Sequence, residues 1–305
     1  MSDFTNPLRT RALVTLFVGA AAIALAPIFV RVSEIGPVET AFYRMFLSLP
    51  VLAVWVGLDT RRPHAVRKTL QRRDIVLLVL AGVFFTGDLA LWHWSIRLTT
   101  IANATLFANF APIFVTLGSF FLFGQRFSRT FLFGLVLAIV GVATLVGVSA
   151  GTSRTFLIGD ALGIGTAVFY AAYIMTISRL RAGGLATSVI MLWSGVAAAL
   201  SLFPLALLAG GPLIPPTLAG WAILVGLAII SHAGGQSLIA YALAHLPAAF
   251  SSVGLLVQPV IATMIAWGLF AEAVTGLRAV GIGVVLAGIF FAHRGSFKGA
   301  KSIAT

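Results

Sequence analysis

The segment FAPIFVTLGSFFLFGQRFSRTFLFGLVLAIVGVATL, residues 110–145, contains two apolar runs that are separated by a short polar break. A proline lies in the first run, and two glycines lie seven residues apart in the second. All three recur 147 residues later in one ungapped register: Pro112, Gly134 and Gly141 match Pro259, Gly281 and Gly288. This match indicates a duplication, and we predict two homologous halves at residues 1–148 and 149–305.

The composition of the 305-residue chain excludes an ordinary water-soluble surface. Charged residues make up 9% of the chain and apolar residues 60%, whereas about a quarter of a soluble protein is charged. Most of the exterior must therefore face lipid, and the lipid bilayer is the expected environment. The net charge of +12 fits basic cytoplasmic loops better than a nucleic-acid partner. With no cysteine in the chain we expect no cysteine-based metal site, and we predict neither a metal nor a cofactor.

Helices that cross the hydrocarbon core need about 20 apolar residues. Ten stretches qualify, so we predict an all-α polytopic membrane protein with ten transmembrane helices. The stretches are 12–30, 38–57, 74–94, 101–123, 131–148, 161–178, 187–209, 219–241, 248–270 and 277–292.

The positions of Lys and Arg predict the orientation of these helices. If the N-terminus is inside, fifteen of the twenty basic residues lie in or beside inside segments and four lie outside. Cytoplasmic loops retain positive charge, so we place both termini in the cytoplasm and the chain in the cell (inner) membrane. Each half has five helices, an odd number, so the second half must be inverted relative to the first. Inverted repeats are common in transporters.

Three stretches resemble the EamA repeats of the drug/metabolite transporter superfamily. They are GPVETAFYRMFLSLPV (36–51), IANATLFANFAPIFVTLGSFFLFGQ (101–125) and AYALAHLPAAFSSVGLLVQPVIATMIAWGLFAE (240–272). The resemblance implies two inverted five-helix repeats around a central cavity. It also implies export of amino acids, including aromatic ones, and of other small metabolites.

Charged groups at membrane depth are costly and are functional candidates by default. Arg44 and Asp88 each lie about six residues below the outer end of their helices, at roughly 9 Å depth by helical rise. A shared contact with a zwitterionic substrate and a structural ion pair fit the sequence equally well. Trp92 shares the face of Asp88, and Trp193, about 10 Å deep, is a further aromatic candidate.

Proline breaks in the fourth and ninth helices indicate a site near mid-membrane. Pro112 and Pro259 free backbone carbonyls that neighbours or cavity water can satisfy, and paired breaks of this kind point to the substrate site of a repeat transporter. Simple packing kinks are the alternative. We predict that the polar and aromatic neighbours of these prolines contact substrate: Asn103, Phe107, Asn109 and Gln258.

Two further pairs are candidates for substrate contacts. His232 and Gln236 lie four apart and would share one face of an α-helix; His232 either couples transport to protons or is an ordinary buried histidine. Tyr170 and Tyr173 either line the cavity or pack. The recurring glycines indicate close helix packing, within the chain or between the protomers of a homodimer.

The sequence therefore predicts a secondary transporter that exports small amphipathic metabolites, neutral or aromatic amino acids first, by alternating access. A multidrug or nucleotide-metabolite carrier and a membrane receptor or scaffold are the alternatives. We do not expect an enzyme, because the chain contains no phosphate loop, GxSxG or HExxH motif.

Overall fold

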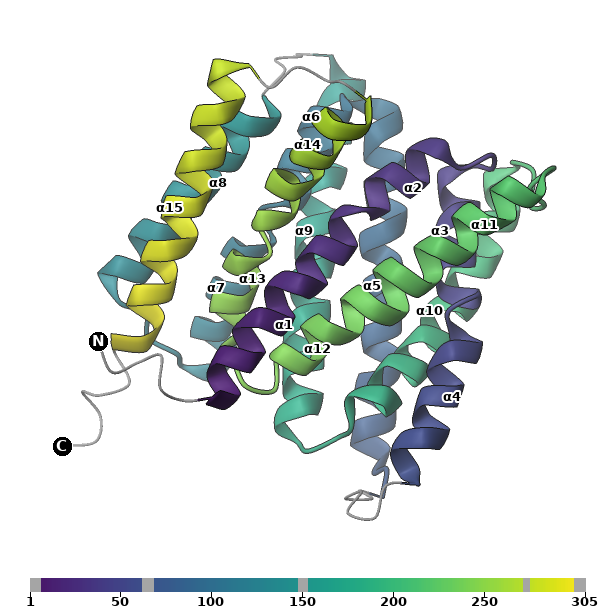
Figure 1. The fold of residues 1–305 in the computed structure, drawn as a ribbon, viewed down its shortest axis with the longest axis horizontal. Coiled ribbons are helices and arrows are strands. Elements are labelled where there is room, and N and C mark those ends of the chain that lie inside the picture. The colour runs from purple at the N-terminus through teal and green to yellow at the C-terminus, as the bar shows by residue number, and fades with distance from the viewer. Residues whose placement is uncertain (1–6, 62–68, 148–152, 271–274, 299–305) are drawn as a thin grey trace. The chain divides into compact units, whose positions relative to one another are not determined.

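The computed structural model describes residues 7–61, 69–147, 153–270 and 275–298 (Figure 1). Within these residues all regular secondary structure is helical, and ten segments are long and apolar enough to cross a membrane. The predicted ten-helix membrane fold is confirmed. The predicted boundary between the halves, at residues 148 and 149, lies outside the described residues. The spans are Pro7–Val32, Pro37–Thr60, Arg72–Leu98, Ala102–Phe123, Arg129–Val146, Arg154–Ala182, Thr187–Ala209, Leu218–Ala242, Ala248–Leu269 and Gly276–Ser296.

Several spans consist of more than one helix. In chain order the elements are α1 (Pro7–Ala24), α2 (Ala26–Val32), α3 (Pro37–Phe46), α4 (Leu49–Thr60), α5 (Arg72–Leu98), α6 (Ile101–Ala108), α7 (Ala111–Phe123), α8 (Arg129–Val146), α9 (Arg154–Ala182), α10 (Thr187–Ala209), α11 (Leu218–Gly226), the π-helix η1 (Leu227–Gln236), α12 (Ser237–Ala242), α13 (Ala248–Gly254), α14 (Val257–Phe270) and α15 (Gly276–Lys298).

Four of the interrupted spans break just before a proline. The proline lies within the first three residues of the second helix: Pro27 in α2, Pro50 in α4, Pro112 in α7 and Pro259 in α14. Proline is tolerated there because the first turn of a helix does not need its N–H groups. The structure thus places breaks where the sequence indicated them and adds two more, at Pro27 and Pro50.

The chain forms two compact units that do not follow sequence order. Unit 1 contains residues 1–90 and 175–245, and unit 2 contains residues 91–174 and 246–305. Helices α5 and α9 each contribute to both units. Each unit therefore combines helices from the two predicted halves.

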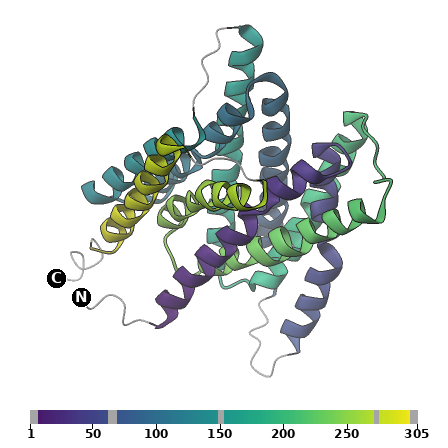
Figure 2. The same ribbon diagram turned by 45° about the horizontal axis from the view of Figure 1, so that its top comes forward.

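In unit 2, α8 and α15 lie side by side along their length (Figures 1 and 2). A Cβ atom on Gly134 would lie 2.3 Å from the backbone nitrogen of Ala292, and one on Gly281 would lie 2.7 Å from that of Leu145. Only glycine permits this approach of the two backbones. The predicted close packing occurs within one chain, so these glycines do not require a second protomer.

The direction of this packing shows how the two halves are related. From Gly134 to Leu145 along α8, the facing positions run backwards from Ala292 to Gly281 on α15, so the helices are antiparallel. Gly134 and Gly281 are 147 positions apart, and so are the residues that face them, Leu145 and Ala292. The duplication therefore reproduces the contact. Equivalent helices that pack antiparallel are related by inversion, and the inverted repeat is confirmed.

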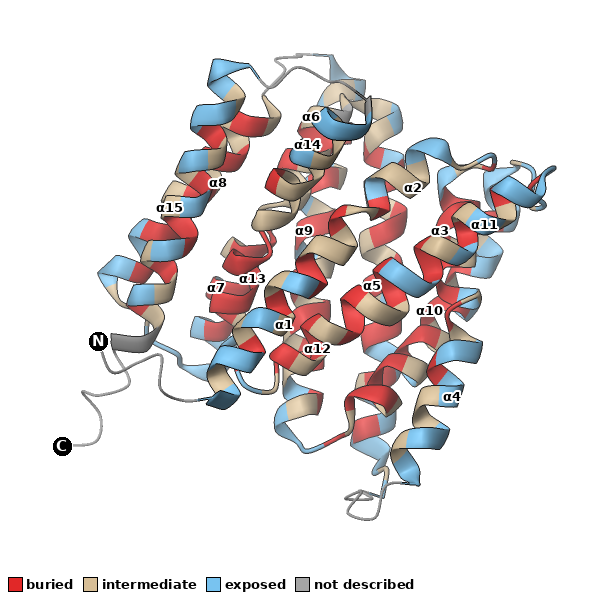
Figure 3. Cartoon of the chain, viewed as in Figure 1, coloured by how far each residue is buried: buried red, intermediate tan, exposed pale blue. Residues whose placement is uncertain are grey.

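Small residues also bring the helices of unit 1 together. A Cβ atom on Gly82 of α5 would lie 2.6 Å from the carbonyl oxygen of Ser194 on α10, and one on Gly19 of α1 would lie 2.7 Å from that of Gly235 on η1. Figure 3 shows exposed residues along most of α4, where Leu52 is the buried residue. The exposed residues of α4 include Val54 and Leu58, as expected for a helix with a lipid-facing surface.

The eighth span differs from the continuous α-helix that we predicted at residues 219–241. Its middle ten residues form the π-helix η1, in which hydrogen bonds join residues five apart. Gly234 and Gly235 lower the α-helical propensity there, and Ser231 Oγ donates to the carbonyl oxygen of Ala22 on α1 at 3.0 Å. Short π segments often occur at functional sites.

Candidate functional site

A buried polar cluster in unit 1 brings together residues of α3, α5 and η1. The Cζ atom of Arg44 lies 5.6 Å from the centroid of the Phe85 ring, and the His232 ring is tilted against the same ring at 5.6 Å. Arg44 is 7% exposed, Phe85 3% and His232 1%. Asp88, half-buried one turn beyond Phe85, is electrostatically attracted to Arg44. The structure thus brings together Arg44 and Asp88, which were predicted as a pair, and His232, which was predicted separately.

Local backbone features hold the members of this cluster. Arg44 lies in the last turn of α3, and Ser48 Oγ donates to the carbonyl oxygen of Met45 at 2.6 Å where the helix is interrupted. His232 and Gln236 are both buried, and they lie in the π-helix η1 instead of the α-helix that we predicted. Neither ring nitrogen of His232 has a hydrogen-bond partner among the described residues.

A second group of predicted residues meets in unit 2 around the breaks in the fourth and ninth spans. A small cavity of about 30 Å³ is lined by residues that include Asn109, Pro112, Tyr170 and Gln258. That volume holds about one or two waters. The Nε2 atom of Gln258 is buried without a hydrogen-bond partner among the described residues, so this amide is a group that a water or a substrate can satisfy.

The two prolines of unit 2 have equivalent surroundings. Thr116 Oγ1 donates to the carbonyl oxygen of Pro112 at 2.7 Å, and Thr263 Oγ1 donates to that of Pro259 at 2.8 Å. A threonine bond to the preceding turn favours bending of a helix. The role of these breaks as hinges of transport stays a prediction.

Asn103 has a structural partner that the sequence did not indicate. Its Nδ2 atom donates to Asp160 at 3.2 Å (Oδ1) and 3.4 Å (Oδ2), and Thr99 Oγ1 donates to the same carboxylate at 2.6 Å. Asn103 is 1% exposed. These bonds tie α9 to the start of α6 within unit 2, so a structural role of Asn103 competes with the predicted substrate contact.

The remaining predicted aromatic residues have varied environments. In unit 2, Trp92 contacts the edge of His93 at 5.0 Å, Phe107 contacts Phe110 at 5.5 Å, and buried Tyr173 stacks on Tyr170 at 6.1 Å. In unit 1, Trp193 is 50% exposed and is absent from the cluster around Arg44. Their contribution to a substrate site stays a prediction.

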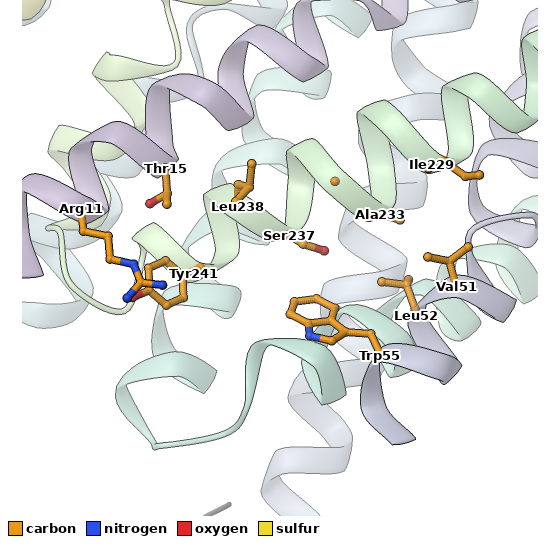
Figure 4. A pocket seen from close by; sticks show the side chains of 11 residues that line it. Arg11, Thr15, Val51, Leu52, Trp55, Ile229, Ala233, Ser237, Leu238 and Tyr241 are labelled. Carbon is orange, nitrogen blue, oxygen red and sulfur yellow. The ribbon is translucent and has the colours of Figure 1, made fainter. Parts of the chain in front are cut away.

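Sequence reasoning missed a pocket of about 500 Å³ in unit 1 (Figure 4). It lies between α1, α4, η1 and α12, and its volume is in the range of small-molecule sites. A signal for it was present, because Arg11 and Thr15 are four residues apart, as are Ser237 and Tyr241. The lining residues are Arg11, Thr15, Val51, Leu52, Trp55, Ile229, Ala233, Gly234, Ser237, Leu238 and Tyr241.

Ten spans, an inverted duplication and buried charges at membrane depth define a multi-pass membrane protein of the transporter class. The EamA-like transporter family matches residues 10–147 and 157–294, so the chain belongs to this family. In the part of the chain that the structure describes, no group of three or more His, Asp or Glu side chains is placed to hold a metal ion.

Several known proteins are similar to this chain. A protein of Streptantibioticus cattleyicolor named as a probable terminal-alkyne amino-acid exporter is 28% identical over 279 residues, which cover 90% of this chain and 89% of the relative. The pseudopaline exporter CntI of Pseudomonas aeruginosa is 25% identical over 70% of this chain and 72% of its own length. One crystal structure, at 17% identity, superposes with a TM-score of 0.79 over 95% of this chain and 99% of that chain, which shows a shared fold.

Proposed function

We propose that this protein exports small amphipathic metabolites, with neutral and aromatic amino acids as its main substrates, by alternating access. The observation that carries the proposal is the buried cluster of Arg44, Phe85, Asp88 and His232 in unit 1. Membrane-spanning transporters retain such costly charges where they bind substrates or coupling ions.

The chemistry of the cluster suits a zwitterion. A guanidinium such as that of Arg44 binds a carboxylate through two parallel hydrogen bonds. The carboxylate of Asp88 can accept from an ammonium group, and the Phe85 ring offers an apolar or aromatic contact to a side chain. When a substrate binds, the attraction between Arg44 and Asp88 would be replaced by contacts of Arg44 with the substrate carboxylate and of Asp88 with its ammonium group.

The names of two relatives support an exporter of this kind. One is named as an exporter of an amino acid and the other as the exporter of pseudopaline. At 28% and 25% identity these relatives support the class of substrate and leave the particular compound to be measured.

Counterflow in proteoliposomes tests the proposal. Labelled aromatic and aliphatic amino acids would be compared with labelled nucleosides and a cationic dye. We expect amino-acid counterflow in the wild type, loss of it in Arg44→Ala and Asp88→Asn, and wild-type rates in Arg97→Ala, which removes an exposed arginine outside the cluster. Inactivity with every amino acid would refute the proposed substrate class, and flux of nucleosides or dye alone would replace it with the other carrier type.

We further propose that both termini are cytoplasmic and that the protein resides in the inner membrane. The support is the distribution of Arg and Lys, which cluster at one end of the spans.

A further inference from the structure

The 500 Å³ pocket of unit 1 is separate from the residues assigned to substrate. Its walls come from α1, α4, η1 and α12, and none of the residues of the Arg44 cluster lines it. Figure 4 shows the side chains of Arg11 and Thr15 on one side, Trp55 on another, and Ser237 and Tyr241 between them.

One end of the pocket is basic and aromatic. Arg11 lies near the start of α1 and Tyr241 near the end of α12, and the Cζ atom of Arg11 lies 5.8 Å from the Tyr241 ring centroid. Trp55 lies in the last two turns of α4. Arginine and aromatic residues at the ends of spans are typical of the membrane interface.

A second arginine increases the positive charge at this end. Arg181, in the last turn of α9, lies within electrostatic range of Tyr241 and of Asp59. Asp59 itself accepts a hydrogen bond from Ser188 Oγ at 2.8 Å. Two arginines against one carboxylate leave a net positive charge beside Tyr241, which is complementary to an anion.

The other end of the pocket is aliphatic. Val51, Ile229 and Ala233 line it, and Ile229 lies twelve residues before Tyr241, on the order of 15 Å along the helix. The pocket therefore changes from basic to apolar along the direction in which a lipid changes from headgroup to acyl chain.

A buried hydroxyl without a partner lies between the two ends. Ser237 is 5% exposed, lines the pocket, and its Oγ atom has no hydrogen-bond partner among the described residues. Thr15 also lines the pocket, but its Oγ1 atom already donates to the carbonyl oxygen of Ala12 at 2.9 Å. Because an unpaired buried hydroxyl is unfavourable, Ser237 indicates a polar group of a ligand one turn deeper than Tyr241.

We propose that this pocket binds one anionic phospholipid. The phosphate lies at Arg11 with Arg181 nearby, an ester carbonyl of the glycerol accepts from Ser237 Oγ, and an acyl chain lies along Val51 and Ile229. Basic pockets between membrane helices bind lipid headgroups in this way. A zwitterionic amino acid fits less well, because the lining contains no carboxylate for its ammonium group.

Native mass spectrometry of the full chain in detergent, with phosphatidylglycerol or phosphatidylcholine as the added lipid, tests the proposal. We expect one phosphatidylglycerol to bind in preference to phosphatidylcholine. Arg11→Gln should weaken that binding about fivefold, as expected for one basic contact near the membrane surface. Ala233→Phe, which fills the aliphatic end, should abolish it.

Two matched variants serve as controls, and thermal unfolding checks that all four fold. Arg126→Gln removes an exposed arginine of unit 2, and Ala222→Phe adds a ring at an exposed position of the same span as Ala233. Both should bind lipid as the wild type does. Equal binding of the two lipids, or equal losses in Arg11→Gln and Arg126→Gln, would overturn the proposal. Displacement of the lipid by a free amino acid would also overturn it and would make the pocket a substrate site. If Ala233→Phe does not fold, the two arginine variants still decide.

Discussion

The guanidinium of Arg44 lies over the Phe85 ring, with 5.6 Å between its Cζ atom and the ring centroid. His232 contacts the same ring from the π-helix η1. Phe85 therefore contacts both a buried cation and a buried imidazole, which come from two other spans. A cation over a desolvated ring gains about 2 kcal/mol, so Phe85 is expected to position Arg44 for its substrate.

Replacement of this ring should impair transport more than folding. We expect Phe85→Leu to lower amino-acid counterflow at least tenfold. The reason is that the loss of about 1.4 kcal/mol of the interaction that positions Arg44 corresponds to a factor of about ten in rate. Phe85→Trp, which retains a π face, should preserve more of the rate. Phe120→Leu, at an exposed position, is the control, and an unchanged rate in Phe85→Leu would show that the ring only fills space.

His232 offers a test of stability. Its ring nitrogens are buried without partners among the described residues, and an unsatisfied buried polar group costs about 1–3 kcal/mol. His232→Phe keeps a ring against Phe85 and removes both nitrogens, so the thermal unfolding midpoint in detergent should rise. A clear fall in the midpoint would mean that a bound water or ion satisfies the imidazole.

The contact between α8 and α15 predicts that the substitution of glycine by alanine has different effects on stability at two nearby positions. Gly288→Ala places a Cβ 2.3 Å from the backbone nitrogen of Ala138, so it should destabilise by about 1–3 kcal/mol. A Cβ atom on Gly283 would have no neighbouring heavy atom within 4 Å. Gly283→Ala should therefore be neutral or stabilise by up to about 1 kcal/mol. Thermal unfolding of both variants measures the difference, and equal effects would contradict the antiparallel contact.

We expect Asn103 to stabilise the fold without contacting substrate, which a comparison of unfolding midpoint and KM can test. Asn103→Leu removes a donor to the Asp160 carboxylate, and a hydrogen bond to a charged group contributes about 1.5–3 kcal/mol. We expect a lower unfolding midpoint with an unchanged KM for the folded fraction. A raised KM at wild-type stability would instead establish the substrate contact that the sequence suggested.

The orientation can be measured by single-cysteine labelling, because the chain has no cysteine of its own. Thr60→Cys and Pro216→Cys introduce thiols at exposed positions, one at the end of the second span and one just before the eighth. We predict that these two positions face opposite sides of the membrane. An impermeant maleimide should label Pro216→Cys in intact cells and Thr60→Cys after permeabilisation. The reverse pattern would place the termini outside.

Much of the fold could be predicted because lipid restricts the alternatives. Backbone polar groups that face lipid must be satisfied within their own helix, so each span is a long apolar run that is visible in the sequence. The recurrence of Gly134 as Gly281 revealed the duplication, and the odd number of helices per half revealed the inversion. The pairing of α8 with α15 then followed the same glycines.

The site was less predictable because it depends on contacts between distant segments. Arg44 and Asp88 could be paired by depth, but no local pattern indicates that Phe85 and His232 join them. The breaks at Pro27 and Pro50 lie in runs that read as continuous helices. The 500 Å³ pocket also escaped prediction, because Arg11 reads as an ordinary topological charge until α12 is placed beside α1.

The π-helix η1 sets the direction of the side chains that follow it in the eighth span. An α-helix turns about 100° per residue, and a π-helix, with hydrogen bonds between residues five apart, turns less. A return of the ten residues of η1 to α-helical bonding would therefore rotate Ser237 and Tyr241 about the helix axis and turn them away from the space between α1 and α4. A change of hydrogen-bonding pattern would thus erase this pocket with no change in the sequence.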